Sequence, residues 1–157
     1  MMKAAVLKAS LDTMGRKDVV IVDHPRPDDF VYGSCESSIA LAAKDILIRI
    51  KAHFDVSETS ILTVRKKMGD QLDERTWQQK SAMTFDLFNE FINHVAGDFK
   101  RKLYGEQILT SMSLPTASRG FGELLESDAV RPEFFHAYWL LQGEGYSFVC
   151  TVGVQIS

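Results

Sequence analysis

One stretch of the chain sets its organisation, and it reads Asp86-Leu87-Phe88-Asn89-Glu90-Phe91-Ile92-Asn93-His94-Val95-Ala96-Gly97-Asp98. The stretch lies inside a longer amphipathic run with the period of a helix. One stripe of this helix is apolar: Phe85, Phe88, Ile92, Val95, Phe99 and Leu103. A second stripe follows at steps of four, three and four residues: Asp86, Glu90, Asn93 and Gly97. At about 100° per residue the stripes point roughly 150° apart, so the helix should bury the first and expose the second.

Strand patterns flank this helix on both sides. Before it, Ile46–Phe54 alternates between apolar and more polar residues, and Ser38–Ala43 is its predicted hairpin partner across Lys44-Asp45. Further strands are predicted at Val19–Val22, Ile108–Leu114, Phe134–Leu141 and Tyr146–Ile156. Loops are predicted at Asp23–Ser34 and Ala117–Pro132. The sheet that these strands form should have one buried face and one wetter face.

Two helices are predicted between the hairpin and the next strand. The first begins at Ser57 as N-cap and runs to about Met68, and the second runs from Asp73 or Thr76 to Tyr104. A weaker helical pattern covers Ala4–Met14. This order of elements predicts an α+β fold, with an antiparallel sheet of about five or six strands packed with two long helices.

The composition limits the classes of protein to which the chain can belong. The chain has 157 residues, 45% hydrophobic and 25% charged, which is typical of a single globular domain over residues 1–157. A net charge of −3 provides no basic field to attract nucleic acid or an anionic membrane. The sequence has neither a signal-peptide pattern nor an apolar run of transmembrane length, so we expect a cytoplasmic protein.

The cysteines and histidines form no recognisable metal or redox motif. Cys35 and Cys150 lie far apart with no CxxC, and Cys150 falls on the apolar face of a predicted strand as a small core residue. The four histidines are scattered without the spacing of metal ligands. We therefore expect no metal site built by this chain alone.

The polar stripe is the candidate site. An ionised glutamate such as Glu90 accepts hydrogen bonds from a lysine or arginine, and the carboxamide of Asn93 can orient a water without titrating. Gly97 costs the helix about 1 kcal/mol relative to alanine. Either the approach of a partner or close packing within the chain would compensate for that cost. On these residues alone, a functional stripe and a plain solvated helix face both remain open.

The pattern Glu90-x-x-Asn93-x-x-x-Gly97, preceded by Asp86 and followed by Pro115, resembles the signature of the CheC/CheX chemotaxis phosphatase family. That family carries Asp or Ser, three residues, Glu, two residues and Asn on a helix, and then a proline on the following strand. The segment around Pro115 also looks like the family's strand ending in Leu-Pro. The likeness is best from about Asp73 to Gly120.

Three features depart from the family pattern. Twenty-one residues separate Asn93 from Pro115, one fewer than in the family, and Asp98 stands where the family often has Asn. CheC-type members carry two copies of the Glu-x-x-Asn motif, whereas here Glu58 is followed three residues later by Ile61. A single motif is similar to the CheX branch, whose members pair as homodimers, so the resemblance implies a homodimer.

The resemblance implies hydrolysis of the phosphoaspartate on a response-regulator receiver domain such as CheY. Asn93 would orient the attacking water, Glu90 would dock on the receiver lysine, Asp86 would support docking and Gly97 would let the partner approach. No cofactor is expected on this chain alone, and Mg²⁺ is expected from the receiver partner. One alternative is a non-catalytic receiver-binding or flagellar-switch interaction module on the same fold. Another is a structural domain whose stripe is simply solvated.

Overall fold

The computed structural model describes residues 2–15, 17–22, 33–63, 75–120 and 135–156. Four predicted features fall wholly or mostly outside these residues. They are the loop at Asp23–Ser34, the end of the first predicted helix at Met68, most of the loop at Ala117–Pro132 and the start of the strand predicted from Phe134.

The described strands form one antiparallel sheet of seven in the order β1-β6-β7-β3-β2-β4, with β5 also paired to β2. Their bounds are β1 Val20–Ile21, β2 Cys35–Ala42, β3 Ile46–Phe54, β4 Ser111–Met112, β5 Thr116–Arg119, β6 Phe135–Gly143 and β7 Tyr146–Ile156. The hairpin of β2 and β3 and the C-terminal strand follow the prediction. The α+β class is confirmed, and the strand count exceeds the predicted five or six.

The difference arises around Pro115. The strand predicted at Ile108–Leu114 contracts to the two residues of β4, and the start of the predicted loop becomes β5. Both strands pair with β2, so they share its outer edge on either side of the proline. All four residues of β5 are exposed, so this strand has no buried face and leaves no alternating apolar pattern in the sequence.

The helices differ from the predicted pair of long ones. α3 (Trp77–Gly105) has 29 residues and begins at Thr76, where a capping box with Gln79 satisfies backbone donors at the first turn. The helix expected from Ser57 is instead the four-residue α2 (Val56–Thr59), which continues as a 3₁₀ turn. Its N-cap is Asp55, because the Asp55 carboxylate accepts a hydrogen bond from the Ser57 amide at 2.9 Å.

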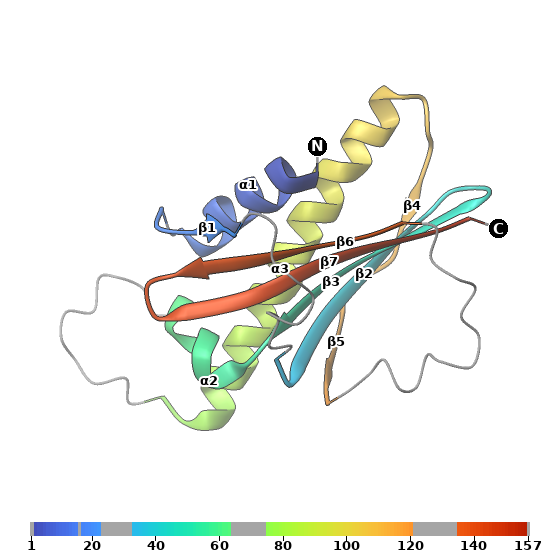
Figure 1. Cartoon of the computed structure of the whole chain (residues 1–157). Coiled ribbons are helices and arrows are strands. Elements are labelled where there is room, and N and C mark those ends of the chain that lie inside the picture. Colours follow the sequence, from blue (N-terminus) through green and yellow to red (C-terminus); the bar gives the residue numbers. More distant parts are fainter. Residues whose placement is uncertain (1, 16, 23–32, 64–74, 121–134, 157) are drawn as a thin grey trace.

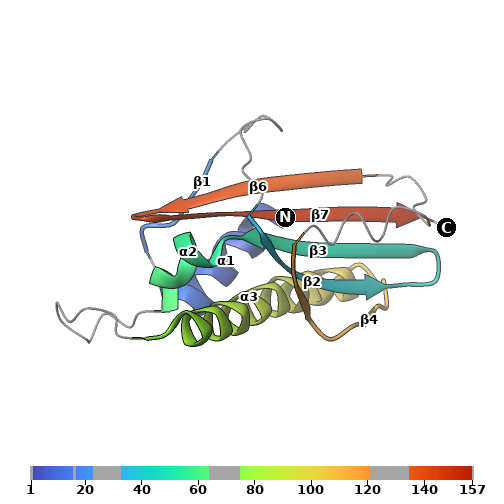
Figure 2. The same cartoon turned by 90° about the horizontal axis from the view of Figure 1, so that it is seen from below.

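The second helix of the layer comes from the weaker N-terminal pattern. α1 (Met2–Met14) lies beside α3 on the same side of the sheet (Figure 1 and Figure 2). Ala5, Val6 and Ala9 are buried there. α1 ends before Gly15, which has a φ of +60° that glycine adopts without steric cost.

The apolar stripe of α3 enters the core as predicted. Phe88, Ile92 and Val95 are fully buried between the helix and the sheet. The ring of Phe54 on β3 stacks on Phe88 with centroids 3.9 Å apart, and Phe148 on β7 meets Phe88 edge-on at 5.0 Å. This packing sets the rotation of α3, because turning the helix would lift the phenylalanines out of the core.

Cys150 on β7 is fully buried, and burial raises the pKa of its thiol to about 12. The thiol therefore stays protonated at neutral pH and contributes as a small apolar group, as the sequence predicts.

Candidate functional site

The polar stripe lies on the solvent side of α3. Asp86, Glu90 and Asn93 are exposed, and Gly97 is half-buried. The structure therefore places these four predicted site residues on one accessible helix face. Pro115 lies between β4 and β5, in the segment that runs along the edge of β2.

One flank of the stripe is tied to the sheet. The Ser37 hydroxyl on β2 donates a hydrogen bond to the Asn89 carboxamide on α3. Further towards the helix N-terminus, Arg119 of β5 donates to the Ser81 hydroxyl and places its guanidinium 5.5 Å from the centre of the Phe85 ring. These contacts hold β2 and β5 against the helix on one side of the stripe.

The other flank is α1, and Asp98 connects the two helices. Its carboxylate lies 2.8 Å from Lys102 Nζ, 3.1 Å from Arg101 Nη2 and 3.9 Å from Lys8 Nζ of α1. The hydrogen bond from Lys102 lowers the pKa of Asp98, and Arg101 and Lys8 add to this effect against the opposing effect of burial. At the position where the family often has Asn, this chain therefore has an ion-paired carboxylate that faces α1.

Glu90 has a weaker neighbour within its own helix. Its Oε1 lies 3.9 Å from His94 Nε2, one turn further along α3. Both side chains are largely exposed, at 61% and 44%. Such a long, solvated contact contributes little energy, so it leaves the Glu90 carboxylate accessible to a partner.

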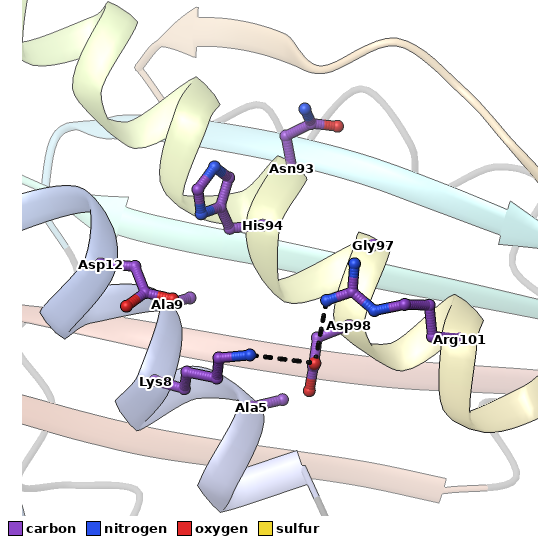
Figure 3. Close-up of a pocket in the computed structure, with 9 residues that line it drawn as sticks. All are labelled: Ala5, Lys8, Ala9, Asp12, Asn93, His94, Gly97, Asp98 and Arg101. Carbon is purple, nitrogen blue, oxygen red and sulfur yellow. Dashed lines mark hydrogen bonds and ion pairs between the residues drawn. The ribbon is translucent and has the colours of Figure 1, made fainter.

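A hollow of about 260 Å³ lies beside Asn93, between α1 and α3 (Figure 3). It is lined by Ala5, Lys8, Ala9, Asp12, Asn93, His94, Gly97, Asp98 and Arg101. A methyl group built on Gly97 would meet no atom within 4 Å. Close packing against another described element is therefore not the reason for this glycine, and the space next to it is open.

Several residues of this region were not predicted from the sequence. Lys8 and Asp12 of α1 line the hollow, although the N-terminal helix was expected from periodicity alone. His94 and Arg101 also line it, and their spacing from Asn93 and Gly97 would have placed them on the neighbouring helix face. The position of α1 could not be predicted, because local sequence patterns do not specify which helix it packs against.

Two further observations concern only the described residues. Among them, no group of three or more His, Cys, Asp and Glu side chains could hold a metal ion. The helices within the same residues include none that is long and apolar enough to cross a membrane.

The fold is similar to solved chemotaxis proteins. A chain in the structure of the CheX–CheY–BeF3–Mg²⁺ complex from Borrelia burgdorferi matches with a TM-score of 0.72 and 11% identity, over 98% of this chain and 95% of that chain. CheX from Vibrio vulnificus matches with a TM-score of 0.69 and 13% identity, over 98% and 96%. Thermotoga maritima FliY matches with a TM-score of 0.53 and 12% identity, over 100% and 85%.

No protein-family model matches the chain, and no curated protein matches it in sequence. The likeness therefore resides in the arrangement of helices and strands, and it extends over nearly the whole chain. The resemblance inferred from the motif on α3 is confirmed in the fold: this chain has the fold of the CheX and CheC-like chemotaxis proteins.

Proposed function

We propose that this protein binds a CheY-like receiver domain and hydrolyses its phosphoaspartate. The single observation that carries the proposal is that Glu90 and Asn93 project from one accessible face of α3, with open space over Gly97 one turn later. A receiver domain can therefore approach the helix closely at the point where the carboxamide lies.

In this mechanism Asn93 holds a water in line with the bond between phosphorus and the aspartate oxygen. Its amide can accept a hydrogen bond from that water while donating to a phosphoryl oxygen. Attack forms a new phosphorus–oxygen bond, breaks the bond to aspartate and releases the aspartate carboxylate and inorganic phosphate, which carries both protons of the water. Most of the acceleration then comes from positioning, since an asparagine does not titrate.

The other stripe residues act in docking. Glu90 binds the receiver's lysine through a charge-assisted hydrogen bond, and Asp86 adds a second carboxylate one turn earlier. Gly97 leaves room for the partner. Mg²⁺ belongs to the receiver, where it would neutralise the phosphoryl oxygens. No cofactor held by this chain enters the proposal.

The similarity to the chain from the CheX–CheY–BeF3–Mg²⁺ complex supports a receiver as the partner. By the same likeness we expect a cytoplasmic chemotaxis protein that acts as a homodimer. Sedimentation velocity of the purified chain would test the dimer, and a monomer across the accessible concentrations would contradict it.

The test of catalysis is the decay of phosphorylated receivers. Receiver domains of the source organism are phosphorylated with acetyl phosphate, and the loss of the phosphoryl group is followed with and without this protein. Asn93→Ala should reduce the acceleration by about 10² or more, as for loss of a residue that orients the nucleophile. Glu90→Ala should mainly weaken binding. Gln78→Ala, an exposed carboxamide truncation on the same helix but outside the stripe, is the matched control.

A second candidate function is a non-catalytic module that binds a receiver or a flagellar-switch component. The similarity to FliY supports this second function. So does Asp98, which stands where the CheC/CheX family often has Asn. Binding of a beryllofluoride-loaded receiver without any acceleration of phosphoryl loss would select this function. Acceleration that survives both Asn93→Ala and Glu90→Ala would reject the catalytic roles given above, and absence of any binding would leave the stripe as a solvated surface.

A further inference from the structure

The cations of the hollow between α1 and α3 are far more exposed than the carboxylate of Asp98 that they surround. Lys8, Arg101 and Lys102 all surround the single carboxylate of Asp98. Asp12 adds one further carboxylate to the lining. The lining itself holds two cations, Lys8 and Arg101, and two carboxylates, because Lys102 lies outside it. The two cations reach solvent, with side chains 61% and 72% exposed, whereas the Asp98 side chain is only 16% exposed.

The far end of the stripe has the opposite charge. Asp86 and Glu90 are exposed there, before Asn93, whereas Arg101 follows Asn93 on α3 and Lys8 lies on the adjoining α1. Arg101 is eleven residues after Glu90 on α3, which is about 16 Å along the helix axis. The accessible face is thus acidic at one end and basic at the other, with Asn93 between the two.

The hollow exists because small residues face one another across the helix pair. Ala5 and Ala9 of α1 lie opposite Gly97 of α3, and the space at the glycine is open. Its volume of about 260 Å³ is several times the roughly 30 Å³ that one water molecule occupies in the liquid. The hollow can therefore admit a side chain from a partner. Figure 3 shows Lys8 and Asp98 meeting across it and Arg101 on its α3 side.

We propose that this hollow receives an acidic side chain of the receiver partner, which Lys8 and Arg101 bind. α1 is then part of the docking surface, and the polarity of the face sets the direction in which the receiver lies along α3. The inference rests on the proposed function. The occupant is acidic because carboxylates hold Mg²⁺ in a site of this kind, so acidic side chains lie on the receiver near its phosphoaspartate, apart from the lysine that Glu90 binds.

Charge reversal tests this proposal. Lys8→Glu and Arg101→Glu should each raise the KM for the phosphorylated receiver by about tenfold and leave kcat within about twofold, because charges at the rim act on association. The effect should shrink as salt is added. Lys44→Glu is the matched control, because it makes the same change of charge in the turn between β2 and β3, and it should keep the wild-type KM.

The variants also need a check of their fold, since Lys8 pairs with Asp98 across the two helices. Lys8→Gln and Arg101→Gln remove charge without introducing repulsion, and they should raise KM by a smaller factor. Thermal unfolding of each variant confirms that α1 stays docked. A receiver variant with an acidic surface residue changed to lysine should recover affinity for Lys8→Glu while losing it for the wild type.

The outcomes separate this inference from the proposed function. If the wild type accelerates phosphoryl loss and both reversal variants keep its KM and salt dependence, the hollow is not a docking site and the catalytic proposal stands. If kcat falls while KM is unchanged, the inference is also wrong. If the wild type binds a beryllofluoride-loaded receiver without catalysis, the same KM predictions apply to the dissociation constant. If it neither binds nor accelerates, both proposals are rejected.

Discussion

Ser37 on β2 and Asn89 on α3 are joined by a hydrogen bond from the serine hydroxyl to the carboxamide oxygen, one helical turn before Asn93. Ser37 is fully buried, and Asn89 lies on the edge of the helix between the core and the exposed stripe. The bond therefore adds to the phenylalanine packing that sets the rotation of α3. Both contribute to the direction in which the candidate site points.

Removing this bond should destabilise the protein. Ser37→Ala leaves the half-buried Asn89 carboxamide without its partner, so the free energy of unfolding should fall by about 1–2 kcal/mol. Urea unfolding followed by circular dichroism measures the change. Ser118→Ala, at an exposed position of β5, is the control and should be within about 0.5 kcal/mol of the wild type. Equal stability of the two variants would contradict the structural role of the bond.

Gly97 should lower the stability of the folded protein and favour binding of the receiver. Gly97→Ala adds a methyl group that meets no atom within 4 Å, and alanine favours the helix by about 1 kcal/mol. The variant should therefore be more stable than the wild type. Gly97→Leu should also fold, but it should fill the hollow and weaken receiver binding more than alanine does. A stable leucine variant with undiminished binding would show that no partner approaches this position.

Asp98 should contribute stability that depends on pH. Its folded-state pKa is lowered, so its ion pairs stabilise the native state above the ordinary pKa of 3.8 and are lost as the pH falls through the lower folded value. Asp98→Asn should cost less than about 1 kcal/mol at pH 7, because the cations around it are mostly solvated. The difference from the wild type should shrink as the pH is lowered further below 3.8, until Asp98 is protonated in the folded state. A difference that persists there would mean that packing, not charge, is responsible.

His53 should make the protein sensitive to mild acid. The imidazole is buried on β3, and burial, with the nearby Lys51 cation and His136, lowers its pKa from 6.5 to about 4. Glu36 Oε2 lies 3.8 Å from Nδ1, but the same oxygen is closer to Lys51, at 3.5 Å. The charge of that carboxylate is therefore shared, and burial dominates.

Above about pH 6.5 this imidazole is neutral in both states. Between about 6.5 and 4 the unfolded chain takes up the proton and the folded chain does not, so stability falls as the pH falls. The loss due to His53 should reach up to about 3 kcal/mol. His53→Gln should flatten this part of the profile, measured by urea unfolding at successive pH values. An unchanged slope would mean that the group is already charged in the native state.

Much of the fold could be predicted because its signals are local. The helical period of α3 places Phe88 on the buried face and Glu90 on the exposed face. The alternation of apolar residues in β3 and β7 identifies the buried faces of these strands. These patterns depend on residues a few positions apart. β5 could not be predicted in this way, because Thr116 to Arg119 pair along an exposed edge and bury no face. The cap at Asp55 was missed because Ser57, two residues later, is also a good capping residue.

The sequence by itself determined which residues lie on the exposed stripe of α3, since a helix sets the relative directions of its own side chains whatever surrounds it. The tertiary structure alone decided what lies on either side of that stripe. Asn89 meets Ser37 and Asp98 meets Lys8 only after segments far apart in the chain have packed together. Such contacts depend on the volume and shape of the whole core, which no local pattern records. For that reason Asn93 could be named from the sequence, while the hollow beside it could not.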